Sequence, residues 1–229
     1  MDIKNNLRML QESVAEACRE KNRKPEDVNI VAVTKYVSVE TALKAAEAGV
    51  VHFGENRLEG LIEKKKHLPE HVIWHFIGSL QTRKVKDVLP HADYIHSLDR
   101  LSLAEEIQKR ADRTVSCFVQ VNISGEESKH GLNVKEVMDF VDKLSKLDRI
   151  KVAGLMTMAP FTEDDEEIRR VFSELKKLQK TVQERNLPHA PCAELSMGMS
   201  NDFKIAVEEG ATYIRIGSSL VGNEKEEVS

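Results

Sequence analysis

Short β-rich runs alternate with longer helical patterns along almost the whole chain, and this alternation limits the possible folds more than any other feature. In the helical patterns apolar residues recur every three or four positions, as at Val134, Val137, Val141 and Leu144. Strict alternation predicts parallel strands joined by right-handed crossovers, and eight such units match an α/β fold, the (β/α)8 TIM barrel. An open doubly wound sheet is the alternative. The predicted strands cover residues 28–35, 51–56, 72–78, 93–98, 115–123, 151–158, 193–198 and 212–217.

The sequence predicts a single domain over residues 1–229, with one extra helix before the barrel. No linker rich in proline, glycine or serine interrupts the alternation of strands and helices. Near the amino terminus, apolar side chains at Ile3, Leu7, Leu10 and Val14 have the spacing of an amphipathic helix, whereas a signal peptide would carry an unbroken apolar segment.

Composition excludes several classes of partner. The formal net charge is -4 and 5% of the residues are aromatic, so the chain lacks both the basic surface and the stacking platforms that nucleic acids require. No apolar run is long enough to span a membrane. Cys18, Cys117 and Cys192 are an odd number at wide spacings, which fits a reducing location better than a disulfide framework. We therefore expect a cytoplasmic protein that binds neither nucleic acid nor membrane.

Polar and small residues collect where the predicted strands end, which is where a TIM barrel builds its active site. Lys35 ends the first strand and Asn56 the second. The stretches "SMGMSND" and "RIGSS" follow the last two strands, and they place Ser200, Gly217 and Ser218 where barrels of this kind bind phosphate. Alternatively, Gly198 and Gly217 only serve turns and Ser200 only caps a helix. The two stretches together favour a phosphorylated ligand.

A phosphate site opposite a strand-end lysine suggests a carbonyl ligand held as a Schiff base on Lys35, since a lysine in a partly desolvated pocket keeps a neutral, nucleophilic amine. A sugar phosphate in an aldolase and pyridoxal 5′-phosphate (PLP) both satisfy this pattern. Arg215 favours PLP, because it alternates with outward-facing isoleucines and so points into the barrel, where the ring nitrogen of PLP would be a partner. A structural ion pair with a carboxylate such as Glu194 is the alternative for this arginine.

Several longer motifs resemble one known family, the pyridoxal phosphate homeostasis proteins, which share a fold-type III barrel with the N-terminal domain of alanine racemase. The resemblance covers nearly the whole chain. It implies that Lys35 carries PLP as a Schiff base, that Ser200, Gly217 and Ser218 hold the phosphate, and that Arg215 faces the pyridine nitrogen. Asn56 is carried over as a further binding residue. The motifs are "AVTKY", "FGEN", "WHFIGSLQTRKVK", "VNISGEESKHGL", "GLMTMAP" and "LSMGMSNDFKIAVEEGATYIRIGSSLVG".

The same resemblance leaves open whether the chain carries PLP or catalyses a reaction with it. A PLP racemase needs a second acid/base opposite the lysine, and in alanine racemase a separate C-terminal domain supplies it. The eighth predicted strand ends at residue 217 of 229, so we expect no such domain, an open pocket and no efficient catalysis. The expected role is intracellular PLP (vitamin B6) homeostasis, with an indirect effect on amino-acid metabolism. PLP-dependent apoenzymes are candidate recipients, and the chain is expected to be a monomer or weak dimer.

Two enzymatic readings stay open beside the carrier. One is a single-domain PLP enzyme, such as a weak amino-acid racemase, with Tyr36 or Cys117 as its second acid/base. The other is a Schiff-base aldolase that uses no PLP.

Two further signals are less specific. His71 and His75 lie four residues apart, but along a strand this spacing is about 13 Å, too far for one metal ion, and we predict no metal site. The basic stretch "QTRKVK", residues 81–86, either serves solubility or receives an anionic ligand near the pocket mouth.

Overall fold

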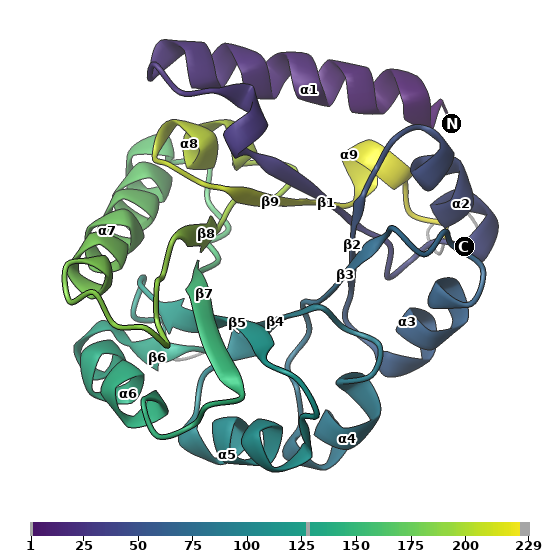
Figure 1. Ribbon diagram of the computed structural model, residues 1–229. Coiled ribbons are helices and arrows are strands. Elements are labelled where there is room, and N and C mark those ends of the chain that lie inside the picture. Colours follow the sequence, from purple (N-terminus) through teal and green to yellow (C-terminus); the bar gives the residue numbers. More distant parts are fainter. Residues whose placement is uncertain (1, 127–128, 225–229) are drawn as a thin grey trace.

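Eight parallel strands close into a ring in the computed structural model, which describes residues 2–126 and 129–224. Figure 1 shows this ring with helices around it. The pairings of β4 with β5 and of β1 with β9 close the sheet, so the predicted TIM barrel is confirmed and the open sheet is wrong. The ring consists of β1 (Asn29–Val33), β2 (His52–Glu55), β3 (Ile73–Phe76), β4 (Tyr94–Leu98), β5 (Val115–Asn122), β7 (Ile150–Met156), β8 (Glu194–Ser196) and β9 (Tyr213–Ile216).

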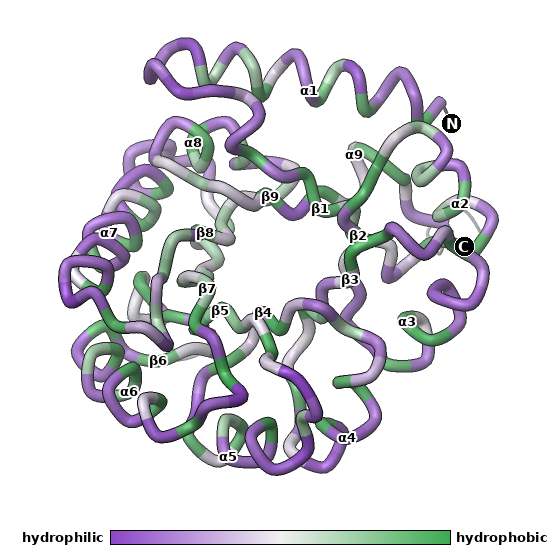
Figure 2. Tube along the Cα trace, in the orientation of Figure 1, coloured by the Kyte–Doolittle hydropathy of each residue, from purple (hydrophilic) through white to green (hydrophobic). Residues whose placement is uncertain are grey.

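Helices pack around the ring with their apolar sides inward, as the green inner and purple outer edges of α7 show in Figure 2. None of the helices between residues 2 and 224, outside the gap at 127–128, is long and apolar enough to cross a membrane. The helices are α1 (Ile3–Glu20), α2 (Val39–Glu47), α3 (Leu58–Lys65), α4 (Val85–Val88), α5 (Leu101–Arg110), α6 (Val137–Leu144), α7 (Asp165–Gln183), α8 (Phe203–Glu208) and α9 (Ser218–Val221).

The extra N-terminal helix is also confirmed. Its apolar residues Ile3, Leu7, Leu10 and Val14 are all buried, and α1 lies across α8 and α9 on the outside of the barrel (Figure 1). The short strand β6 (Leu132–Asn133), which pairs with β5 outside the ring, was not predicted because two residues carry no periodic signal.

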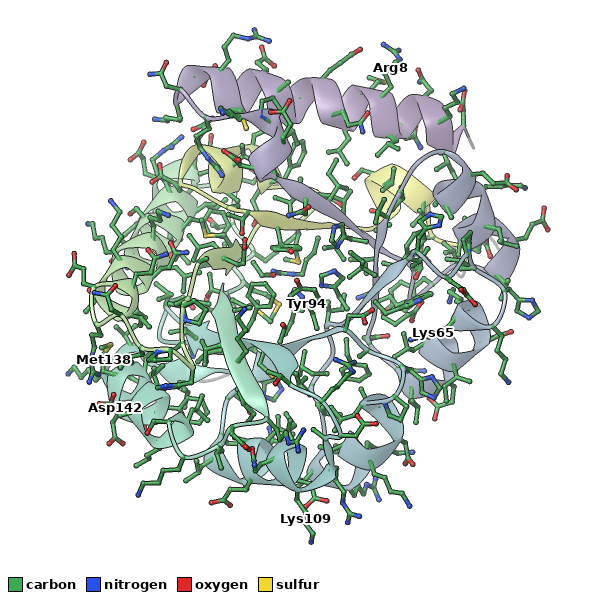
Figure 3. The ribbon with its side chains drawn as sticks, in the orientation of Figure 1. Arg8, Lys65, Tyr94, Lys109, Met138 and Asp142 are labelled. Carbon is green, nitrogen blue, oxygen red and sulfur yellow. The ribbon has the colours of Figure 1, made fainter. Side chains whose placement is uncertain are left out.

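Two apolar layers follow from the alternation of side chains along the strands. Ile214 and Ile216 belong to the large core between the ring and the helices, whereas Tyr213, Phe118 and Met156 pack inside the ring. The labelled Tyr94 lies in this interior in Figure 3. Successive side chains along β9 therefore point alternately to the helix layer and to the barrel interior. Arg215 lies between Ile214 and Ile216, so it points inward.

A close approach between β7 and β8 explains Gly154. A Cβ at this position would lie 1.9 Å from the carbonyl oxygen of Glu194, and backbone cannot move aside as a side chain can. We predict that Gly154→Ala lowers the free energy of unfolding in urea by at least about 2 kcal/mol. The control Lys151→Ala, an exposed position on the same strand, should stay within about 0.5 kcal/mol of wild type. A Gly154→Ala variant as stable as the control would contradict this account of the packing.

Candidate functional site

One cleft at the carboxyl end of the barrel gathers the predicted site residues. It has a volume of about 1110 Å³ and lies between the ends of the strands and the loop that leads to α7. Residues that are up to 183 positions apart in the sequence (35 and 218) thus share one wall. All six predicted binding residues line the cleft, namely Lys35, Asn56, Ser200, Arg215, Gly217 and Ser218.

Lys35 lies in a turn two residues beyond the end of β1. Its side chain is exposed, and its Nζ atom stands 4.7 Å from the centroid of the Tyr36 ring. A partly desolvated lysine was expected from the sequence, and the structure corrects this: the amine is open to solvent at the mouth of the cleft.

A buried polar group anchors the residue before Lys35. The backbone N–H of Thr34 donates to the carbonyl of Gly54, and its hydroxyl donates to the Glu55 carboxylate at 2.7 Å. The same carboxylate forms a buried ion pair with Lys64 at 2.9 Å. Because buried charges are costly without partners, this group resists rearrangement, and it fixes the point from which the Lys35 side chain leaves the barrel.

Two serine-bearing segments meet at one end of the cleft. The Ser219 hydroxyl donates to the Ser200 hydroxyl at 3.1 Å, and α9 begins at Ser218 with Gly217 as its N-cap. Ser200 caps no helix, since Asp202 is the N-cap residue of α8. The first N–H groups of a helix have no acceptor within it, so hydroxyls and N–H groups from two segments converge on a place that suits an anion.

Gly198 makes the sharp turn of the first segment possible. Its φ is +93°, and a Cβ there would lie 2.5 Å from the Cβ of Ala206. The glycine therefore lets Ser200 approach the start of α9.

Arg215 is buried beneath the cleft. It donates from Nη1 to the Ser196 hydroxyl at 2.6 Å and from Nη2 to the Thr157 carbonyl at 3.0 Å. No carboxylate of residues 2–126 or 129–224 forms an ion pair with it, so the alternative pairing with Glu194 is wrong. Burial lowers the pKa of the guanidinium to about 10, and Asp202 opposes this shift. Arg215 thus places in the floor of the cleft a cation that forms no ion pair within residues 2–126 and 129–224.

Three histidines form a hydrogen-bonded chain inside the barrel that was missed at the sequence level, where only His75 was considered, as a metal ligand with His71. His52 on β2, His75 on β3 and His96 on β4 are joined by hydrogen bonds, and His96 contacts Ser196. Burial lowers the pKa of each ring, most strongly for His75 and His96. One histidine at an inward position in each of three successive strands was the signal that could have found them.

Other predicted features lie away from the cleft. His71 is exposed and His75 is in the interior, and no group of three possible ligands is placed to hold a metal ion in the part of the chain that the structure describes. Residues 81–86 fall on the 3₁₀ turn Thr82–Lys84 and on α4, outside the lining of the cleft.

Cys117 fails as a candidate acid/base. It belongs to the core between the ring and the helices and is fully buried. Burial raises the pKa of its thiol to about 12. A group with neither access to the cleft nor a suitable pKa cannot exchange protons with a ligand there.

The fold is a (β/α)8 barrel, and a lysine, two serine-bearing segments and a buried arginine surround one cleft at its carboxyl end. The model of the family "Alanine racemase, N-terminal domain" matches residues 3–225. A pyridoxal phosphate homeostasis protein from Aquifex aeolicus is 38% identical, over 98% of this chain and 100% of the relative. One from Haemophilus influenzae is 32% identical, over 97% and 96%. The chain belongs to the pyridoxal phosphate homeostasis protein family.

Solved structures agree with this assignment. PipY of Synechococcus elongatus, solved with PLP bound, is 33% identical with a TM-score of 0.80, covering 91% of this chain and 100% of PipY. An alanine racemase from Clostridium difficile has a TM-score of 0.75 at 17% identity, covering 96% of this chain and 56% of the racemase. The second similarity is one of fold alone.

The buried histidines predict a fall in stability at acid pH. Folding holds His75 and His96 neutral, with pKa values well below 6.5, whereas the unfolded chain takes up protons there once the pH falls through about 6.5. The stabilisation is therefore complete above this pH. Below it, each of the two histidines lowers the free energy of unfolding by about 1.4 kcal/mol for every pH unit.

We expect the free energy of unfolding in urea to drop by about 2–3 kcal/mol between pH 7.5 and 5.5. His96→Gln removes one of the two buried titrating groups, so this pH dependence should fall to about half in the variant. An unchanged slope in His96→Gln would show that other groups set the pH dependence.

Proposed function

We propose that this chain binds PLP at the carboxyl end of its barrel and serves pyridoxal phosphate homeostasis as a carrier, without efficient catalysis of its own. Relatives that bear the name of that role match over nearly their full length, and the similar PipY holds PLP. The observation that carries the proposal is the convergence of a lysine, an anion site and a buried arginine on one cleft.

The wall residues fit the cofactor group by group. Lys35 would hold the aldehyde carbon as a Schiff base, and the segment containing Ser200, Gly217 and Ser218 would receive the phosphate. Arg215 would face the ring nitrogen. When bound, the cofactor supplies a carbonyl that reacts with amines and a ring that accepts electron density.

Asn56 would form the wall between these groups. Its backbone packs directly on Gly78, where a Cβ would lie 2.4 Å from the Asn56 carbonyl oxygen. The contact holds this part of the wall in place, and the Asn56 side chain is half-buried at the cleft.

Arg215 argues against strong catalysis. A guanidinium only donates hydrogen bonds, so Arg215 would donate to the lone pair of the ring nitrogen and would favour the unprotonated form of that nitrogen. An unprotonated ring withdraws electrons less well. The exposure of Lys35 adds to this, because water is poorly excluded from the reacting bond.

The alternative, a single-domain PLP enzyme such as a weak racemase, needs a second acid/base. Tyr36 is the remaining sequence candidate, but its ring lies beside the Lys35 amine, on the same strand-end turn. The Asp202 carboxylate, also in the cleft wall, already accepts the backbone N–H of Met199. A carrier fits this arrangement better, with PLP-dependent apoenzymes as the proposed recipients. The lysine amine of such an apoenzyme could reach the cofactor through the open mouth of the cleft.

We predict that borohydride reduction of the PLP-loaded protein, followed by peptide mass mapping, places a phosphopyridoxyl group on Lys35. The reason is that Lys35 is the lysine that lines the described cleft. Lys35→Arg keeps the charge but cannot form the bond, so it should stay unlabelled, whereas Lys84→Arg in the basic stretch should label like wild type. Labelling that is reproducibly elsewhere, or absent from saturated protein, would overturn the assignment.

A further inference from the structure

A chain of hydrogen bonds runs through the barrel interior from Arg215 toward the amino end of the strands. Ser196 Oγ lies 3.0 Å from His96 Nδ1, His96 Nε2 lies 2.8 Å from His75 Nδ1, and His75 Nε2 lies 2.9 Å from His52 Nδ1. His75, His96 and Ser196 are completely buried. His52, the first residue of β2, is half-buried.

Arg215 sets the direction of this chain. A guanidinium only donates, so the Ser196 hydroxyl accepts from Arg215 and keeps its own proton for His96 Nδ1. His96 must then carry its proton on Nε2 and donate it to His75. By the same step His75 carries its proton on Nε2 and donates to His52.

The reverse direction is less favourable for two reasons. It would leave the Ser196 hydroxyl accepting from both sides, and its proton has no further partner among residues 2–126 and 129–224. It would also turn the N–H ends of the imidazoles toward a buried cation. In the stated direction the lone-pair ends face Arg215, so the dipoles favour its charge.

Packing holds the rings in these orientations. The Tyr94 ring is stacked on His75 with a centroid distance of 4.7 Å and an interplanar angle of 8°. Phe118 lies 4.3 Å from His96, and Tyr213 contacts both His52 and His75. A ring flip would break two hydrogen bonds in a closely packed interior.

We propose that His96, His75 and His52 act through Ser196 as positioning residues that hold the Arg215 guanidinium in its place in the floor of the cleft. Arg215 is 5% exposed and forms no ion pair in the described part of the chain. Asp202 favours its charge only from beyond ion-pair distance, so polar neighbours contribute to the compensation for its burial. The benefit to the ligand rests on the proposed binding of PLP, whereas the tautomers are a property of the protein alone.

The first test is the ¹⁵N spectrum of the imidazole rings in the ligand-free protein. The proposal predicts neutral His75 and His96 at pH 7, each with the proton on Nε2 and an accepting Nδ1. An Nδ1–H tautomer at His96, or a charged ring at either position, would overturn the proposal whether or not PLP binds.

The second test separates the chain from Arg215. Ser196→Ala removes the connecting hydroxyl, and we expect PLP affinity measured by equilibrium dialysis to fall about tenfold. His96 should lose its fixed tautomer in the same variant. Ser196→Thr restores the hydroxyl and should recover both properties, which a merely structural role would not require.

His71→Gln, at an exposed position, is the matched histidine control and should change neither readout. Suppose that Ser196→Ala folds, as judged by circular dichroism, and that it binds PLP and keeps the His96 tautomer like wild type. The hydrogen-bonded histidines then do not position Arg215. Should Ser196→Ala fail to fold, the tautomers of the wild-type protein still decide the question.

Discussion

Closure of the parallel strands into one ring is the constraint on which the rest of the structure depends. It sends every second strand side chain into a narrow interior where water cannot satisfy polar groups. Aromatic rings fill part of this space, and the inward polar groups of four strands join into one hydrogen-bonded chain. Closure also brings the carboxyl ends of all strands to one mouth, so the site and the interior chain are two results of one geometry.

Arg215 belongs both to the site and to the interior chain of hydrogen bonds. Its guanidinium donates to the Ser196 hydroxyl and to the Thr157 carbonyl, and it lines the cleft. The arrangement gives the cleft a positive floor that donates hydrogen bonds, with a solvent-exposed lysine at its mouth. We propose that such a site serves the retention of an anionic, ring-bearing ligand, because its floor offers a positive charge and hydrogen-bond donors.

Much of this architecture could be predicted from the sequence because it depends on local periodicity. The eight ring strands, the N-terminal helix and the inward direction of Arg215 all follow from the spacing of apolar residues. The convergence of Lys35 with Ser200 and Ser218 follows from the general position of sites in TIM barrels.

What the sequence could not supply depends on pairings between distant residues. The exposure of Lys35, the burial of Cys117 and the histidine chain are set by which strands lie opposite one another in the ring. Ser196 illustrates the point, because its partners His96 and Arg215 come from different sides of the barrel and no local pattern in "ELSMG" indicates them.

We propose that the chain delivers PLP to other proteins and does not use it in catalysis. The most direct measurement mixes PLP-loaded protein with the apo form of a PLP-dependent transaminase and follows its recovery, while racemisation and decarboxylation by the carrier alone are assayed in parallel. The account predicts that the transaminase regains activity and that turnover by the carrier stays near background. Turnover on the order of 1 per second or faster, abolished by Lys35→Ala and without transfer to the apoenzyme, would contradict it.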